Sequence, residues 1–196
     1  MRTRLGATAD IFSGLVVGPG SIAGKGAHFL PALSVRDLGG WRVSIADADV
    51  ITVEHPEKAR RYMARSGDVL VAARGTQLKA AIVPIDAADA VVTASLIGVR
   101  PDTARLLPEV LLAFLRSPEG VAELSGRARS ATGQLALTRA DVERIEVPLP
   151  ARETQERIAV IIRELNDYEA SAERAMRLRR QAAEQALSDL MRDAAA

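Results

Sequence analysis

The C-terminal stretch VPLPARETQERIAVIIRELNDYEASAERAMRLRRQAAEQALSDLMRDAAA runs from Val147 to Ala196. After Pro150 it contains neither glycine nor proline, and it consists mainly of residues with high helix propensity. The pattern therefore predicts one uninterrupted helix over residues 151–196. At 1.5 Å per residue this helix would be about 60 Å long or more.

An apolar seam follows the predicted helix at heptad spacing. Its positions are Ile158, Ile161, Leu165, Tyr168, Ala172 and Ala175, and after a slip of one residue Met176, Ala183, Leu187 and Leu190. Arg179 and Arg180 interrupt the seam where leucine would be expected. A helix of this length extends beyond one small domain, so the seam predicts a partner helix, most simply that of a second copy. A helix folded back onto its own domain is the alternative.

The sequence before the predicted helix differs in composition, because all 14 glycines and all 9 prolines lie there. Short runs rich in Val and Ile, each bounded by Gly, Pro or Asp, predict strands. These runs are Trp41–Ile45, Val50–Val53, Asp68–Ala73, Ala80–Ile85 and Val91–Val99. Pro108 and Pro118 each open a short predicted helix, and Gly126 closes the second. We therefore predict an α/β (α+β) fold, with a mixed-sheet domain over residues 1–150 and a long coiled-coil-type helix over residues 151–196.

Composition excludes several classes of protein. The chain of 196 residues is 48% hydrophobic and 26% charged, which is typical of folded rather than disordered proteins. Aromatic residues make up only 3%, which argues against stacking of bases or sugars on aromatic platforms. There is no cysteine, and the spacing of His28 and His55 matches no zinc motif, so both histidines are expected at the surface. No apolar run is long enough for a signal peptide or a membrane span, and we expect a cytoplasmic protein without membrane contact.

No catalytic motif is recognisable. The stretch GPGSIAGKGAH (Gly18–His28) lacks the glycine spacing and the Ser or Thr of a phosphate-binding loop. Neither a G-x-S-x-G elbow nor a G-x-G-x-x-G strand–turn–helix unit is present. Asp86 and Asp89 fit an acidic turn between two strands better than a metal pair. The sequence predicts a binding protein without catalytic residues, metal ligands or a cofactor of its own.

Four segments in fixed order resemble the specificity subunit of type I restriction–modification systems. They are LGATADIFSG (5–14), SGDVLVAARGTQLKAAIV (66–83), VVTASLIGVRPD (91–102) and ATGQLALTRADVERIEVPLPARETQERIAVII (131–162). The usual subunit has two recognition domains and two spacer helices, whereas this sequence shows one of each and resembles a half-subunit.

The resemblance implies a domain that reads one half of a split double-stranded DNA target. It also implies docking of a separate DNA adenine methyltransferase and, in a full system, a translocase–nuclease. Basic character is concentrated in residues 1–80, which hold eleven Lys and Arg against seven acidic residues. The predicted DNA-binding residues come from three loops expected to converge on one face: Lys25, Arg74, Thr76, Gln77, Lys79, Arg127, Arg129 and Gln134.

Among these residues, Lys25 and Lys79 are expected on phosphates, and Arg74 or Gln134 on base edges. The predicted contacts of a homodimer or partner helix are Ile158, Ile161, Leu165, Tyr168, Met176, Leu187 and Leu190. Two other functions stay open. One is a DNA-binding module of another phage-defence or DNA-modification pathway, and the other is a coiled-coil adaptor that binds no DNA.

Overall fold

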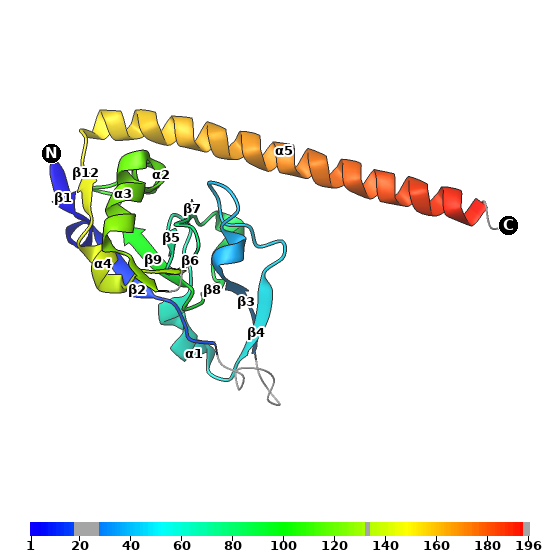
Figure 1. The fold of residues 1–196 in the computed structure, drawn as a ribbon, viewed down its shortest axis with the longest axis horizontal. Coiled ribbons are helices and arrows are strands. Elements are labelled where there is room, and N and C mark those ends of the chain that lie inside the picture. Colours follow the sequence, from blue (N-terminus) through cyan, green and yellow to red (C-terminus); the bar gives the residue numbers. More distant parts are fainter. Residues whose placement is uncertain (18–27, 132–133, 194–196) are drawn as a thin grey trace.

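The computed structural model describes residues 1–17, 28–131 and 134–193. Figure 1 shows a body of small sheets and short helices lying beneath one long helix, α5 (Arg152–Asp193). The N-terminal part of α5 covers the body, and its C-terminal part extends past it.

The central sheet is antiparallel and has the strand order β2-β9-β5-β7. Its strands are β2 (Ala9–Ser13), β9 (Leu96–Pro101), β5 (Val69–Ala72) and β7 (Ala80–Ile82). All four residues of β5 are buried, as the unbroken apolar run predicts for a strand covered on both faces. On β9, Gly98 allows the Phe12 ring to lie against the backbone, since an added Cβ would come within 2.2 Å of that ring. The larger core cluster joins one face of this sheet to α2, α3 and α5.

A second sheet has the order β4-β3-β8 and carries a separate small core. Its strands are β3 (His28–Leu33), β4 (Asp49–Val53) and β8 (Val91–Val92). Strand β3 runs antiparallel to β4 and parallel to β8.

Two smaller sheets tie distant parts of the sequence together. One has the order β10-β11-β6, from β10 (Arg129–Ala131), β11 (Gln134–Ala136) and β6 (Arg74–Gly75). The other pairs β1 (Arg2–Arg4) with β12 (Glu146–Pro148), which places the N-terminus beside the start of α5.

The predicted short helices are confirmed. They are α2 (Pro108–Arg116) and α3 (Pro118–Arg127), each with proline in its first turn. The Ser117 side chain caps α3 by accepting from the Gly120 N–H at 3.1 Å. Two further short helices are α1 (Pro56–Ala59) and α4 (Arg139–Glu143).

Two strand predictions are wrong. Trp41–Ile45 is not a strand, because it meets β7 only at one bridge between Arg42 and Ile82 and then departs. Val91–Val99 is not one strand, because the chain turns at residues 93–95 and passes from β8 in one sheet to β9 in another. In that run Val91, Thr93, Ser95 and Ile97 alternate with their neighbours, which predicts one strand with a wetter face, but the turn interrupts this pattern.

Helix α5 confirms the predicted long helix, but its first turns pack on the body. The side chains of Gln155, Ala159, Ile162 and Asn166 are buried, spaced four, three and four residues apart. Ile158, which we predicted in the partner seam, is half-buried against the body's own core, so that assignment is corrected. The rest of the seam lies on an adjacent face, and from residue 171 to residue 192 every side chain is exposed.

Candidate nucleic-acid interface

Two of the three predicted loops are joined in one small sheet. Ala136 of β11 lies directly opposite Arg129 of β10 on one side and Arg74 of β6 on the other. Residues directly opposite in antiparallel strands point to the same face, so Arg74 and Arg129 flank the small Ala136 on one face. The Cα atoms of Arg74 and Arg129 are separated by two strand-to-strand steps, which is about 10 Å in total. This separation suits two contacts with anionic groups or base edges.

The loop that carries Arg74 is fixed at its base. The Ala73 N–H donates to the Ser95 carbonyl at 2.8 Å, and the Leu137 N–H donates to the Ala73 carbonyl at 2.8 Å. Gly75 has φ of +153°, a conformation that a residue with a side chain rarely adopts. The backbone thus holds Arg74 at the exposed end of β5.

The remaining predicted residues of this loop follow at its tip. Thr76 and Gln77 are exposed, and Lys79 is half-buried where the chain enters β7. The Lys79 carbonyl accepts from the Ala72 N–H at 2.9 Å, which closes the loop. Hydroxyl, amide and ammonium groups are therefore gathered beside Arg74.

Arg127 and Arg129, which the sequence analysis treated alike, have different environments. Arg127 is half-buried, forms an ion pair with Glu123 at 3.1 Å and donates to the Arg144 carbonyl at 3.1 Å. It joins the end of α3 to the end of α4. Arg129 is exposed and forms no ion pair within the described residues. Arg129 thus has the side chain that is available to a ligand.

Helix α4 anchors the other end of β11. The Thr138 hydroxyl accepts from the Asp141 N–H at 3.2 Å, and the Thr138 N–H donates to the Asp141 carboxylate at 2.9 Å. The hydrogen bond from the Thr138 side chain, together with that from its backbone, lowers the pKa of Asp141. The charges of Arg129 and Arg144 contribute in the same direction. This capping box fixes the chain at Thr138, two residues after β11 ends.

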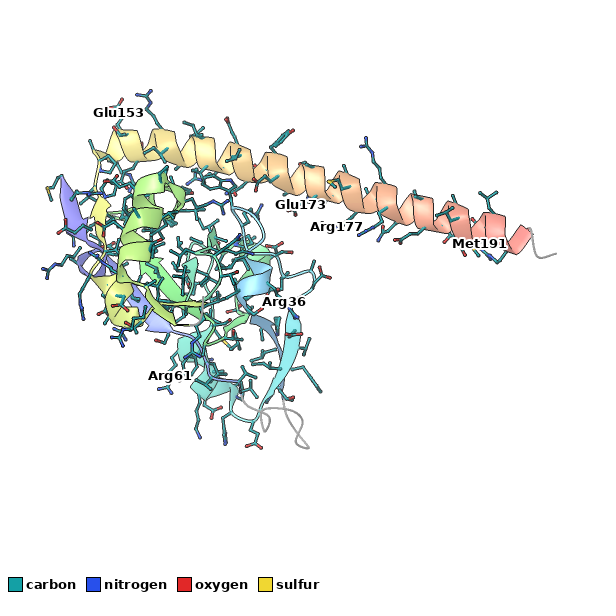
Figure 2. All side chains as sticks on the ribbon, viewed as in Figure 1. Arg36, Arg61, Glu153, Glu173, Arg177 and Met191 are labelled. Carbon is teal, nitrogen blue, oxygen red and sulfur yellow. The ribbon has the colours of Figure 1, made fainter. Side chains whose placement is uncertain are left out.

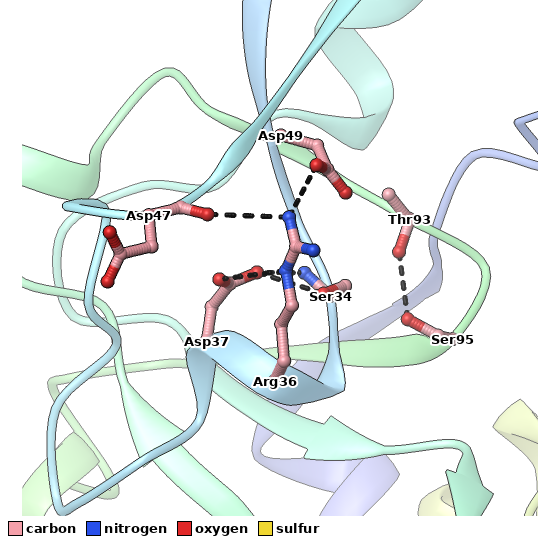
Figure 3. Close-up of polar contacts among 7 residues, drawn as sticks. All are labelled: Ser34, Arg36, Asp37, Asp47, Asp49, Thr93 and Ser95. Carbon is pink, nitrogen blue, oxygen red and sulfur yellow. Dashed lines mark hydrogen bonds and ion pairs between the residues drawn. The ribbon is translucent and has the colours of Figure 1, made fainter.

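Sequence reasoning missed a hydroxyl pair beside this sheet. The Thr93 and Ser95 hydroxyls lie 2.8 Å apart in the turn between β8 and β9 (Figure 3). Both residues are half-buried, and the Ser95 carbonyl holds the Ala73 N–H. The only sequence signal was the Thr-Ala-Ser alternation, which we interpreted as part of a strand.

The ion-pair group around Arg36 in Figure 3 is structural. The guanidinium lies 2.5 Å from the Asp49 carboxylate and donates to the Asp47 carbonyl at 3.3 Å. The hydrogen bond that Arg36 donates to the Asp49 carboxylate and the charge of that carboxylate raise the pKa of Arg36. Asp37 is buried and accepts from the Ser34 N–H at 2.6 Å. Arg36 therefore braces the turn that precedes β4.

Two predicted DNA-binding residues have no side-chain description. Lys25 lies outside the described residues, and of Gln134 only the backbone position in β11 is described.

The histidines and the acidic turn are placed as expected. His28 and His55 are both exposed, and His55 Nδ1 lies 3.2 Å from the Glu57 carboxylate. Asp86 and Asp89 lie in the turn between β7 and β8. Within the described ranges, no three His, Asp or Glu side chains gather as metal ligands would. None of the helices described is both long enough and apolar enough to cross a membrane.

Solved structures share this fold. The HsdS subunit from Thermoanaerobacter tengcongensis superposes with a TM-score of 0.59 at 22% sequence identity, over 89% of this chain and 39% of that chain. A chain from a structural study of complex assembly and conformational transition in the type I R-M system gives 0.62 at 24% identity, over 89% and 40%. The type IIG restriction endonuclease BpuSI gives 0.61 at 11% identity, over 83% and 26%.

These comparisons define a fold class, one that includes chains of type I restriction–modification systems and of a type IIG restriction endonuclease. Within it, the chain has the fold of type I HsdS subunits, and the fold that the resemblance implied is confirmed. No protein-family model matches the sequence, and no curated protein matches it either. The chain spans about two fifths of the length of the HsdS chain, since it covers 39% of it.

Proposed function

We propose that this chain is a DNA-recognition component of a restriction–modification system, reading one half of a split target in duplex DNA. The observation that carries the proposal is the pairing of β6, β11 and β10, which sets Arg74 and Arg129 on one face of a fixed sheet. An arginine side chain can make two parallel hydrogen bonds to a guanine edge or to a phosphate.

The surrounding groups suit the same task. Thr76 and Gln77 supply neutral donors and acceptors, and Lys79 supplies a charge for the phosphate backbone. The sheet is braced by backbone hydrogen bonds at both ends, so its side chains are held in position before DNA arrives. We assign the phosphate contacts to Lys25 and Lys79 and the base contacts to Arg74 or Gln134.

We further propose that α5 joins two copies in an antiparallel homodimer. Its exposed apolar side chains include Ile161, Leu165, Tyr168, Met176, Leu187 and Leu190, with 37% to 74% of their surface accessible. A stripe of this kind is stabilised when a second helix covers it. Antiparallel pairing would place the two DNA-reading sheets at opposite ends, as a target split by a spacer requires.

The proposed role implies partners and no chemistry of its own. The dimer would recruit a DNA adenine methyltransferase and, in a full system, a translocase–nuclease, all acting in the cytoplasm where the DNA lies. Those partners would use S-adenosylmethionine, ATP and magnesium. The chain itself would carry out neither methyl transfer nor cleavage.

Selection from random-sequence duplex DNA tests this proposal. We expect enrichment of a motif in two parts separated by a fixed spacer. Copurification of a methyltransferase would distinguish a restriction–modification component from a module of another defence pathway. Absence of binding to any duplex at low salt would refute the DNA-reading function and favour the coiled-coil adaptor.

A further inference from the structure

A second basic surface lies outside the loops discussed above. Four exposed cations occur within eight residues on α1 and the turn that follows it, and we call Lys58, Arg60, Arg61 and Arg65 the basic knob. The only acidic residue between Pro56 and Arg65 is Glu57, which pairs with His55 at 3.2 Å.

Within the described residues, the basic knob concentrates four unpaired charges in one short segment. Elsewhere in the body, half of the arginines are neutralised by a nearby carboxylate, and these are Arg2, Arg36, Arg42, Arg100, Arg127 and Arg139. In the part of the chain that the structure describes, no carboxylate forms an ion pair with any residue of the basic knob. Four like charges held this close repel one another and favour a polyanion that lies across them.

The backbone beneath the basic knob is held rigidly. Ala64 donates its N–H to the Ala90 carbonyl at 2.9 Å and accepts from the Asp89 N–H at 2.9 Å. The Tyr62 ring packs on the small core of the second sheet, and the Arg61 guanidinium lies 4.7 Å from the centre of that ring. The cations are thus presented by a fixed scaffold rather than by a loose loop.

Contacts connect the basic knob to the proposed reading surface. Tyr62 shares the small core with Leu15, and Leu15 forms a bridge with Thr93. The turn that contains Thr93 holds the base of the Arg74 loop through the Ser95 carbonyl. Both surfaces therefore border the same turn, and α1 lies on the side of the body opposite to α5 (Figure 1). In Figure 2 the labelled Arg61 extends outward from that edge.

We infer that the basic knob is a phosphate-binding surface that holds the duplex beside the bases read by the small sheet. The inference rests on the proposed function and extends it to residues that contact phosphates and do not read the base sequence. Each phosphate neutralised by a cation releases counterions, and each such contact adds about −0.9 to the slope of log K, the DNA-binding constant, against log salt concentration. An acidic protein surface is the competing ligand, and it would not produce this dependence in DNA binding.

The test measures fluorescence anisotropy of a mixed-sequence duplex at several salt concentrations. The variant Lys58→Gln, Arg60→Gln, Arg65→Gln removes three charges and keeps the contact between Arg61 and Tyr62. The matched control, Arg4→Gln, Arg174→Gln, Arg177→Gln, removes three exposed charges from β1 and α5. We expect the slope of the knob variant to fall by about two to three units, with at least about a tenfold loss of affinity near 0.1 M salt. The control should stay close to the unmodified chain.

The outcomes separate the two proposals. If the unmodified chain binds no duplex even at low salt, the proposed function fails and this inference fails with it. If the unmodified chain binds but the knob variant and the control show the same slope and affinity, only the inference is overturned, and the basic knob faces an acidic protein instead.

Discussion

Gln155 offers a sharp test of how α5 is fixed to the body. Its side chain is only 3% exposed, and its Oε1 accepts from the Leu107 N–H at 2.9 Å. Its Nε2 donates to the carbonyls of Arg105 at 2.9 Å and Pro150 at 3.1 Å. One side chain thus links the first turn of α5 to the residue that precedes α2.

Replacing Gln155 with Ala removes all three bonds. Each bond from Nε2 contributes about 1 kcal/mol net, and leaving the buried Leu107 N–H without a partner costs a further 1–3 kcal/mol or so. We therefore expect a loss of about 3 kcal/mol or more in the free energy of unfolding. Urea denaturation followed by circular dichroism and by Trp41 fluorescence measures it, at one fixed protein concentration because association would shift the midpoint.

Gln185 on the same helix provides the control. It is exposed, and its Nε2 donates only to Asp189 at 2.9 Å. Gln185→Ala should change the free energy of unfolding by less than about 0.5 kcal/mol. If Gln155→Ala is as mild as Gln185→Ala, then α5 is not anchored as we describe, and the buried bonds do not fix the angle between helix and body.

Three other predictions concern the helices. Gly120→Ala should lower the free energy of unfolding by about 1–3 kcal/mol, since the added Cβ would lie 2.0 Å from the Phe114 carbonyl oxygen. On the same helix, a Cβ added at Gly126 meets nothing within 4 Å, so Gly126→Ala should raise the free energy of unfolding by about 0.5 kcal/mol. Equal unfolding midpoints for the two variants would refute this packing. Asp141→Asn should lower the free energy of unfolding at neutral pH. The difference in stability between the variant and the unmodified chain should disappear as the pH falls through the lowered pKa of Asp141, because the carboxylate stabilises the fold above its ordinary pKa of about 3.9 and this stabilisation is lost on protonation. A stability difference that stays constant in thermal melts at acid pH would argue against the capping box. The double variant Ile161→Asp, Leu165→Asp should be a folded monomer by light scattering. It should fold because both side chains are at least 37% exposed in one copy, and it should not dimerise because burying carboxylates in a helix–helix seam costs several kcal/mol or so. An unmodified chain that is monomeric at tens of micromolar would contradict the dimer.

Local signals in the sequence were sufficient for the helices α2, α3 and α5 and for the strands β4, β5 and β7. Proline at the first turn of α2 and α3 and the absence of helix breakers after Pro150 are properties of short segments, and the structure confirms both. The prediction of one strand over Val91–Val99 was wrong because the chain passes there from one sheet to another. An alternating pattern cannot distinguish one strand from two strands joined by the turn at Thr93 and Ser95.

The candidate site depended more on long-range pairing. Arg74 and Arg129 are far apart in the sequence, and only the pairing of β6 with β11 shows that they share a face. The structural role of Arg127 had a local signal in the spacing of four residues from Glu123, but we predicted that this helix ends at Gly126, whereas α3 extends to Arg127. The basic knob was hidden in the charge count of residues 1–80, since a sequence does not show which arginines have carboxylate partners.

The DNA-reading claim is tested most directly by the affinity of Arg74→Gln for a selected duplex and for a scrambled one. The matched control is Arg4→Gln, which removes the same charge from β1, and all affinities are measured by anisotropy across salt concentrations. We predict that Arg74→Gln lowers affinity for the selected duplex by about 1–3 kcal/mol, that is about 5-fold to 150-fold. It should also reduce the ratio of the affinity for the selected duplex to the affinity for the scrambled duplex. Equal affinities, ratios and salt slopes for the unmodified chain and Arg74→Gln would contradict the account.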